Sequence, residues 1–572
     1  MRFVRSDCAS ADLSVPMAKR TVCHPLLHWP PMHAKGLSMN NADLLVSALR
    51  QAGVTHGFGV PSGNVLPLME AMRAGGLPFV LTAHEGSAAF AADVMGRMTG
   101  KPGLCIATLG PGATNLTTGV GSAFLDRSPL IAITCNLYQA QLGRRMQMSI
   151  DLHTLFKPIT KASLSLRPGK IGETVAAALR IALSEPHGPV HLDLPEDVAL
   201  ALISEAPMPN VVTPQPLAHA GLESLDPAYA ILRAAKRPIV VIGASAMRMH
   251  TPGSLRAFVE QHQVPFATTT MAKGMIDEDH PLSIGCIERS KRKVQRAFLN
   301  SADLIIALGY DTIEVEYEAW IGKVPLLYFD IEAADVDPSV DVRHGVTGDL
   351  DRAISAFAAM PAVRNDWQMV VITQHREGFQ RALRPKIDAF GPHQAIDVVR
   401  RVLPKNGVLA FDVGAHTHQI ASQWTTHAPR TFLITNGWSS MGFGLPAAIA
   451  AKLACPTLPV VCIVGDGCFQ MTCGEVAVAK RRQLAIPFIV LDDRWLSLIK
   501  VKQERRSLTL YGTDTSPEPY RDPPAHYFGV PAVGVRTADA LERALHRALS
   551  ADGPTVIEAV VDASHYSETV FD

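Results

Sequence analysis

The chain has 572 residues, of which 47% are hydrophobic and 19% are charged, and this length predicts two to four globular domains. Its 53 Lys and Arg residues balance 53 Asp and Glu residues, so the formal net charge of zero provides no bulk field to attract nucleic acid or an anionic membrane. The 42 Gly and 41 Pro residues are scattered, which excludes collagen-like and low-complexity chains.

Residues 1–38 lack hydrophobic periodicity and the apolar segment of a secretory signal. We expect a disordered extension or an upstream start codon chosen in error, outside the fold. No apolar run in the chain reaches the ~18 residues that a membrane helix needs. The nine cysteines are odd in number and lie mostly in apolar runs without a C-x-x-C pair, which predicts reduced thiols, a cytoplasmic location and no zinc site.

From Met39 onward, short apolar runs alternate with amphipathic segments, a pattern typical of parallel α/β domains. Helices are predicted over 41–51, over 65–73 and over the Ala-rich segment that follows Glu85 and closes at Gly100. Buried strands are predicted in GLCIATLGPG, SPLIAITCN and GPVHLDLPED. We therefore place a first domain at 39–205, before a Pro-rich linker at 206–216.

Two further domains follow with the same pattern. The second, at 227–360, carries the apolar runs PIVVIGASA, VPFATTT, ADLIIALGYD and PLLYFDIEAAD. A polar helical stretch near 366–384 leads to the third, at 390–572, which carries GVLAFDVGAH, PVVCIVGDG, IPFIVLDD and GPTVIEAVVD. The predicted fold class is α/β, with three doubly wound domains built on mainly parallel sheets.

Two acidic residues follow neighbouring predicted strands in the third domain. The strand at 460–464 ends in Gly465-Asp466-Gly467, a helix is predicted over 471–481, and the strand at 486–491 ends in Asp492-Asp493. One βαβ unit separates the two acids, so both are expected at the sheet edge where open α/β sheets bind ligands. Hard oxygen ligands beside exposed backbone amides suit a magnesium ion bridging to a diphosphate. The alternative is a turn and a helix cap.

Glu85 is predicted where a buried strand gives way to a helix. A carboxyl group in an apolar setting can exchange a proton near neutral pH, although a glutamate at a helix start is also favoured by the helix dipole alone. The segment Gly110-Pro111-Gly112 permits close approach of a ligand or a neighbouring backbone. Met441 follows a Gly- and Ser-rich loop, where methionine is more often core filling than a ligand support.

Other catalytic motifs fail on spacing. The segment GRMTGKPG ends like a P-loop, but Met95 and Pro102 stand where glycine and Ser or Thr are required. No G-x-S-x-G elbow anchors a hydrolase triad, and PIVVIGASAMRM follows a strand without G-x-G-x-x-G.

Taken together, the chain over about residues 40–570 resembles the thiamine-diphosphate-dependent 2-oxo acid enzymes, most closely the acetolactate synthase large subunits. The resemblance rests on several motifs in order: HEGSAAFAADVMGRMTGKPG, LGPGATNLTTGVGSAF, PITKAS, FDVGAH, SSMGFGLPAA and GDGCFQMTCGEVAVAKR. It implies an N-terminal pyrimidine-binding domain, a central domain and a C-terminal diphosphate-binding domain. It also implies thiamine diphosphate and Mg²⁺ as cofactors and small 2-oxo acids such as pyruvate as substrates.

The resemblance also assigns roles to residues. Glu85 would hydrogen-bond the aminopyrimidine ring of the cofactor, Met441 would support its bent shape, and the backbone near Ser439 would accept from its 4′-amino group. Asp466, Asp493 and the carbonyl of Trp495 would hold Mg²⁺. The residues that would contact the diphosphate are Ala415, His416, Gly465, Gly467 and Cys468. In this family the glutamate and the metal site come from different subunits, which implies a homodimer or homotetramer with active sites at the subunit interface.

The chain departs from the family pattern at several positions. The second metal ligand is usually Asn, whereas this chain has Asp493. The segment that contacts FAD in biosynthetic members reads LGYDTIEVEYEAW, closer to FAD-independent enzymes, so the resemblance implies no FAD. The Trp that shapes acceptor choice falls near Lys502, and the family's Gly-Gln has become Cys135-Asn136.

These departures leave the substrates open. A carboligase of the acetolactate synthase type is the first hypothesis, a non-oxidative 2-oxo acid decarboxylase is the second, and a specialised acyloin synthase or acyltransferase is the third. A catalytically silent binding subunit is the alternative of a different class, and the presence of both Glu85 and Asp466 argues against it.

Overall fold

The computed structural model describes residues 39–205, 214–217, 224–315, 319–516 and 522–570. The extension predicted at 1–38 and most of the linker predicted at 206–216 lie outside them. Within the described ranges, no helix is both long and apolar enough to cross a membrane. Within the described residues, the cysteines from Cys105 to Cys473 are not joined in disulfides.

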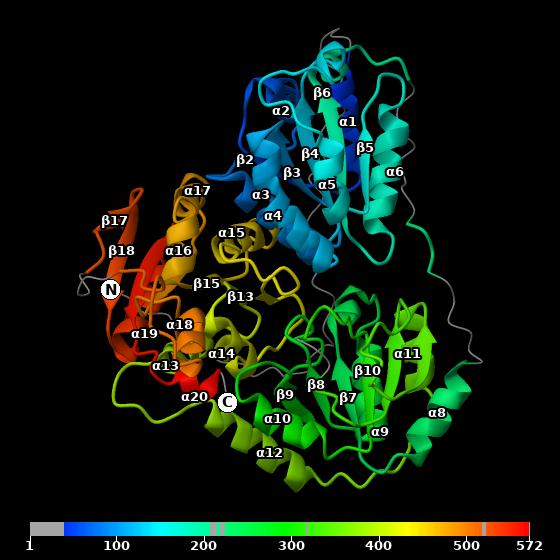
Figure 1. Cartoon of the computed structure of the whole chain (residues 1–572), viewed down its shortest axis with the longest axis vertical. Coiled ribbons are helices and arrows are strands. Elements are labelled where there is room, and N and C mark those ends of the chain that lie inside the picture. Colours follow the sequence, from blue (N-terminus) through cyan, green and yellow to red (C-terminus); the bar gives the residue numbers. More distant parts are fainter. Residues whose placement is uncertain (1–38, 206–213, 218–223, 316–318, 517–521, 571–572) are drawn as a thin grey trace, which may run out of the picture. The chain divides into compact units, whose positions relative to one another are not determined.

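The first domain is a six-stranded parallel sheet in the order β2-β1-β3-β4-β6-β5, with helices on its faces (Figure 1). Its strands are β1 Gly57–Gly59, β2 Phe79–Leu81, β3 Gly103–Thr108, β4 Leu130–Asn136, β5 Ala162–Ser165 and β6 Pro189–Pro195. Its helices are α1 Asn41–Gln51, α2 Leu66–Gly75, α3 Glu85–Thr99, α4 Pro111–Leu125, α5 Leu152–Phe156, α6 Ile171–Leu183 and α7 Glu196–Leu200. As predicted, α3 begins at Glu85 and closes at Gly100, whose φ of 65° suits glycine.

The central domain has a second six-stranded parallel sheet, in the order β12-β11-β10-β7-β8-β9. Its strands are β7 Pro238–Ile242, β8 Phe266–Thr268, β9 Ser283–Cys286, β10 Leu304–Leu308, β11 Leu326–Asp330 and β12 Val342–Thr347. Its helices are α8 Leu225–Ala234, α9 Gly253–His262, α10 Arg292–Leu299 and α11 Leu350–Ala358. The helix α12, Met369–Ala382, then leads to the third domain and corresponds to the predicted polar helical stretch.

The third domain has a seven-stranded sheet in the order β14-β13-β15-β16-β19-β18-β17, parallel except for the β17–β18 pair. Its strands are β13 Val408–Phe411, β14 Phe432–Leu433, β15 Val460–Gly465, β16 Pro487–Asp492, β17 His526–Tyr527, β18 Val530–Val535 and β19 Thr555–Val560. Its helices are α13 Pro392–Val402, α14 Ala415–Gln423, α15 Gly444–Ala454, α16 Asp466–Thr472, α17 Glu475–Arg481, α18 Ser497–Arg505, α19 Ala538–Leu549 and α20 Tyr566–Thr569.

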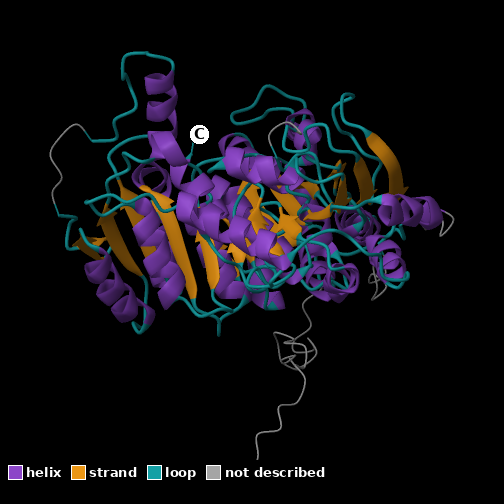
Figure 2. Cartoon of the chain, turned by 90° about the horizontal axis from the view of Figure 1, so that it is seen from below, coloured by secondary structure: helices purple, strands orange, loops and turns teal. Residues whose placement is uncertain are grey.

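Burial explains the apolar runs of the central strands. β3, β4, β7, β10 and β11 are buried at every position. Helices cover both faces of a parallel sheet, so such strands read as continuous apolar segments, and Figure 2 shows the strands in orange among the purple helices. The predicted class, three doubly wound α/β domains on mainly parallel sheets, is confirmed. The first and third sheets also share a strand order, since the third repeats the order of the first and adds β17.

One predicted helix differs from the structure. The segment predicted as a single helix over 471–481 is divided between α16 and α17. Gly474 lies at the break, and a Cβ atom there would lie 3.0 Å from the Cβ of Ala83 in the first domain. The apolar pattern did not reveal this break, which coincides with a close approach between distant segments.

Candidate functional site

Asp466 and Asp493 lie at the carboxyl ends of two neighbouring parallel strands. Gly465, the last residue of β15, pairs in register with Leu491 of β16. Asp466 then begins α16, and Asp493 follows the end of β16. The structure therefore brings the two carboxylates to one sheet edge, as the βαβ spacing predicts.

Burial and mutual repulsion shape the titration of these acids. The pKa of Asp466 is raised to about 7, mainly by burial and also by the charges of Asp493 and Asp492, against a hydrogen bond from Thr515 that lowers it. Burial likewise raises the pKa of Asp493 to about 6, although Ser497 Oγ donates to its Oδ2 at 2.6 Å. A divalent cation would relieve this repulsion, and carboxylate oxygens are the ligands that Mg²⁺ prefers, so the donor set fits the metal.

The loop after β16 is fixed by backbone hydrogen bonds. Trp495 N donates to Asp493 Oδ1 at 3.0 Å, and Leu496 N donates to the carbonyl of Thr513 at 2.7 Å. Trp495 also forms an isolated bridge with Asp514. Trp495 therefore lies next to the acidic pair, where its carbonyl is predicted to serve as a third ligand.

The residues predicted to hold the diphosphate gather around the turn that joins β15 to α16. A Cβ atom on Gly465 would lie 3.1 Å from His416 Cε1, and one on Gly467 would lie 3.4 Å from Met441 Cε. Cys468 Sγ donates to the carbonyl of Val413 at 3.1 Å, which ties this turn to the segment before Ala415, the first residue of α14. Two helix N-termini thus meet at one place, an arrangement that favours an anion.

His416 places a buried polar atom at this turn. Its side chain is buried, and within the described residues its Nε2 has no hydrogen-bond partner. Burial lowers the pKa of this imidazole to about 4, so it is neutral at physiological pH and can donate one N–H bond. In the tautomer with the proton on Nε2, an acceptor such as a phosphate oxygen fits this position.

Asp412 fixes the loop that carries Ser439 and Met441. The carboxylate is fully buried at the end of β13 and accepts from Gly442 N at 3.0 Å and Gly444 N at 2.9 Å. Burial raises the pKa of Asp412 above its usual range. Sequence reasoning assigned this acid no role, although its position directly after an apolar strand is the same signal that identified Asp466.

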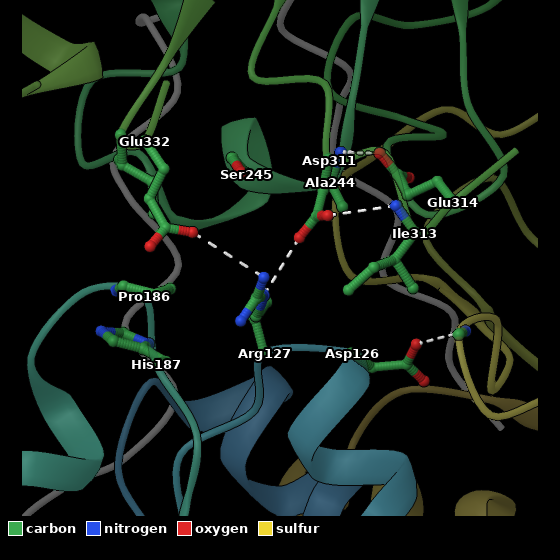
Figure 3. A network of polar contacts seen from close by, with 12 residues as sticks. Asp126, Arg127, Pro186, His187, Ala244, Ser245, Asp311, Ile313, Glu314 and Glu332 are labelled. Carbon is green, nitrogen blue, oxygen red and sulfur yellow. Dashed lines mark hydrogen bonds and ion pairs between the residues drawn. The ribbon is translucent and has the colours of Figure 1, made fainter. Parts of the chain in front are cut away.

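The loop is also anchored by the first domain. Asp126, at the end of α4, accepts from Gly437 N at 2.7 Å, and Arg97 donates to the Ile434 carbonyl at 2.5 Å and to Asp126 at 2.8 Å. Figure 3 shows Asp126 pointing toward this backbone while its neighbour Arg127 turns to the central domain. Ser439 is exposed, with a φ of 49°, and its Oγ donates to the carbonyl of Asn436 at 2.8 Å.

Glu85 belongs to a second group of residues. It is half-buried at the start of α3, and Asn115 Nδ2 of α4 donates to its Oε2 at 2.9 Å. A Cβ atom on Gly112 would lie 3.3 Å from Glu85 Oε1, so the Gly-Pro-Gly segment does provide the predicted close approach. In the described part of the chain, no hydrogen bond or ion pair joins Glu85 to Asp466 or Asp493. The predicted site residues therefore form two groups.

Glu475 connects the third domain to the start of α3, and sequence reasoning missed it. The side chain is 1% exposed, and its Oε1 accepts from Ala83 N at 3.0 Å. Burial raises the pKa of Glu475 to about 7. No local signal identifies this residue, because its partner lies far away in the sequence.

Acidic side chains lie at one edge of the central sheet, next to the point where its strand order reverses. The strand order reverses between β7 and β10, where such sheets bind dinucleotides. Here the Glu314 carboxylate accepts from Ala244 N at 2.6 Å and from Thr269 Oγ1 at 2.5 Å. Figure 3 shows Glu314 beside Asp311. Asp311 and Glu332 both face Arg127. Burial raises the pKa of Glu314 to about 8. A carboxylate on the turn amide does not fit the diphosphate of FAD.

Comparison with known proteins supports a cofactor family for the whole chain. The families described as thiamine pyrophosphate enzyme match in three parts: the N-terminal TPP binding domain at residues 39–155, the central domain at 225–357 and the C-terminal TPP binding domain at 412–559.

Several curated proteins are similar along most of their length. A probable acetolactate synthase large subunit of Methanococcus aeolicus is 30% identical, with 92% of each chain covered. The acetolactate synthase isozyme 1 large subunit of Escherichia coli strain K12 is 32% identical over 81% of this chain and 83% of its own. An acetolactate synthase of Bacillus subtilis strain 168 is 30% identical over 91% and 93%. The chain therefore belongs to the thiamine pyrophosphate enzyme family, with N-terminal, central and C-terminal domains in that order.

Proposed function

We propose that this chain is a thiamine-diphosphate- and Mg²⁺-dependent carboligase of the acetolactate synthase type. It decarboxylates a 2-oxo acid, with pyruvate as the first candidate, and joins the remaining fragment to a second carbonyl compound. One observation carries the proposal: Asp466 and Asp493 share a sheet edge beside the buried His416, whose Nε2 has no partner within the described residues. The similarity to acetolactate synthases along most of the chain supports the reaction type.

Different residues would bind the metal, the diphosphate and the ring system of the cofactor. The carboxylates of Asp466 and Asp493, with the Trp495 carbonyl, would hold Mg²⁺. The diphosphate would be held by the backbone and side chains of Ala415, His416, Gly465, Gly467 and Cys468. Met441, half-buried beside Gly467, would support the cofactor ring, and the backbone near Ser439 would accept from its amino group.

When bound, thiamine diphosphate supplies an acidic carbon and an electron sink for the decarboxylation. The protein's own contribution is orientation and proton transfer. Glu85 would hydrogen-bond the pyrimidine ring nitrogen of the bound cofactor, and Asn115 Nδ2 donates to Glu85 Oε2 and so holds the carboxylate in place. Asp466 and His416 are buried, so they would hold the metal and the diphosphate away from bulk water.

We infer that the enzyme works without FAD. The Glu314 carboxyl group already accepts from the turn amide of Ala244, where a dinucleotide phosphate would bind. The purified protein is expected to lack flavin absorbance. A flavin spectrum at stoichiometric occupancy would overturn this inference.

We also infer that two copies complete each active site. Glu85 and the acidic pair belong to separate groups of contacts, as expected if each group faces its counterpart in a second chain. A homodimer is the minimal assembly, and a homotetramer is compatible with the same interface. The cytoplasmic location stays a prediction from the cysteine pattern.

The test is product identification. The protein loaded with Mg²⁺ and thiamine diphosphate is incubated with pyruvate, alone and with added aldehydes or other 2-oxo acids, and the products are identified by NMR. Acetolactate or a related 2-hydroxy-3-oxo acid supports the proposal. Acetaldehyde as the sole product would show that the enzyme is a decarboxylase, and mixed acyloins would show that it is an acyloin synthase. No turnover of any candidate substrate would contradict the proposed carboligase activity.

A further inference from the structure

A cavity of about 810 Å³ lies between the central and third domains, away from the candidate cofactor residues. Its walls come from α12, from β9 and from the C-terminal end of α14 (Figure 1). This volume is within the range of small-molecule sites. None of the residues assigned to thiamine diphosphate or Mg²⁺ lines the cavity, so it is distinct from the candidate cofactor site.

The cavity has an excess of positive charge. Lys273, Arg376, Arg381, Arg384 and Lys386 line it against the acids Glu278, Asp279 and Glu377. All three acids already have cationic partners: Glu278 binds the buried Lys273 at 2.8 Å, Asp279 binds Lys405 at 2.8 Å, and Glu377 lies 3.7 Å from Arg381. The acids therefore do not neutralise the remaining cations.

Arg376 is the cation most available to a ligand. It is half-buried on α12, and its Nη1 donates to the His280 carbonyl at 3.2 Å. Among the described residues no carboxylate pairs with it. Arg384, by contrast, is held by Asp397 through two bonds of 2.8 Å, so it contributes a fixed charge to the wall. A half-buried guanidinium without a counter-ion favours an anion with a flat, two-oxygen group.

The rest of the wall is apolar and aromatic. Ile284 of β9, Phe379 of α12 and Trp424 after α14 stand in the wall behind the charges, and each is at most 2% exposed. Gly285, with a φ of 93°, has no side chain, and a Cβ atom there would lie 3.4 Å from the Phe379 ring. Aromatic side chains with a few converging polar groups are typical of sites for organic molecules rather than simple ions.

We propose that this cavity binds a small organic anion, whose carboxylate or phosphate group pairs with Arg376 while its apolar part packs against Phe379 and Trp424. The site is separate from the cofactor-binding residues, and its occupancy does not depend on the reaction proposed above.

Calorimetry on the full-length protein, loaded with Mg²⁺ and thiamine diphosphate, tests the proposal. The probes are phenylacetate, phenyl phosphate, inorganic phosphate and benzyl alcohol. Phenylacetate or phenyl phosphate is expected to bind more tightly than inorganic phosphate and benzyl alcohol. Whichever of the two aromatic anions binds more tightly shows whether the site prefers a carboxylate or a phosphate group. Equal binding of inorganic phosphate would overturn the role of the aromatic wall, and no heat from any probe would overturn the site.

Variants assign the binding to the cavity. Arg376→Gln is expected to weaken the best probe about ten-fold or more, since a charge-assisted pair is lost. Lys386→Gln, at an exposed position of the same wall, is expected to weaken it less. Arg401→Gln is the matched control, because Arg401 is exposed on α13 and pairs with Glu542 outside the cavity. Unchanged binding of the best probe to Arg376→Gln would overturn the proposal. Unchanged binding of thiamine diphosphate to each variant shows that the variant is folded.

Discussion

Carboxyl groups dominate the candidate chemistry, and each lies where a strand gives way to a helix or loop. Asp412 follows β13, Asp466 begins α16, Asp493 follows β16, and Glu85 begins α3. These positions combine partial burial with nearby backbone amides, so a carboxylate there is both constrained and able to bind a cation. Single substitutions at these positions separate the roles.

Replacing Glu85 tests its part in proton exchange. Glu85→Gln keeps the shape of the side chain and an oxygen for the Asn115 bond but removes the ionisable group. Turnover is expected to fall by about 10²–10⁴-fold, the usual contribution of a positioned acid or base. Thiamine diphosphate binding, measured by calorimetry, is expected to stay near the wild-type value. Turnover at the wild-type rate would contradict the role of Glu85.

Replacing Asp466 tests the metal site. Asp466→Ala removes one of two carboxylates at the sheet edge, so Mg²⁺-dependent retention of thiamine diphosphate is expected to weaken about 100-fold or more. The matched control is Asp493→Asn, which installs the residue usual in the family and keeps an oxygen ligand, and it is expected to weaken retention far less. If titration calorimetry shows that Asp466→Ala retains thiamine diphosphate as well as the wild type does, Asp466 is not a metal ligand.

Between elements, the most informative tie is the contact from α17 to the start of α3. The Glu475 carboxyl accepts from Ala83 N at 3.0 Å and is almost fully buried. It therefore couples α17, the second helix after the Gly-Asp-Gly turn, to the start of the helix that begins with Glu85. This tie joins the two groups of candidate residues within one chain.

The tie makes stability depend on pH. Burial raises the pKa of Glu475 from 4.5 to about 7 in the folded chain. Between these values the folded chain keeps a proton that the unfolded chain releases, so this residue makes stability fall as pH rises. Glu475→Gln removes that dependence. Relative to wild type, the variant is expected to gain about 1–3 kcal/mol between about pH 5 and pH 8.

Thermal unfolding across this pH range checks the prediction. Glu173→Gln, on the exposed face of α6, is the control and is expected to follow the wild type at each pH. A difference between Glu475→Gln and wild type that stays constant from about pH 5 to pH 8 would contradict the buried proton.

The sequence predicted elements better than it predicted contacts between them. Apolar runs placed the strands, and the spacing from Asp466 to Asp493 placed both acids at one edge, because one βαβ unit has a fixed geometry. Glu475 escaped prediction because its partner Ala83 belongs to another domain. Glu314 escaped prediction because its partner Ala244 lies 70 residues earlier in the chain, after the strand that pairs with β10.

On the scale of the whole molecule, the first and third sheets share one strand order, and the central sheet has another. The two similar domains carry the two groups of candidate residues, Glu85 in the first and the acidic pair in the third. A site assembled from two chains would combine the first domain of one copy with the third domain of the other.

Mixing two inactive variants tests this assembly. Glu85→Gln and Asp466→Ala are combined, dissociated and reassembled. If each site draws Glu85 and Asp466 from different chains, half of the dimers are hybrids with one intact site, so about a quarter of wild-type activity is expected to return. If both residues belonged to one chain, every site would carry a substitution and no activity would return. Each variant reassembled alone is the control.

The helix α14 has a consequence for how the protein responds to its surroundings. Its first residues, Ala415 and His416, lie at the candidate diphosphate site, and its last turn leads to Trp424 in the wall of the cationic cavity. Nine residues of helix span only about 13 Å. A molecule that shifts this rigid segment changes cofactor retention, and by thermodynamic reciprocity the cofactor changes the affinity of that molecule by the same factor.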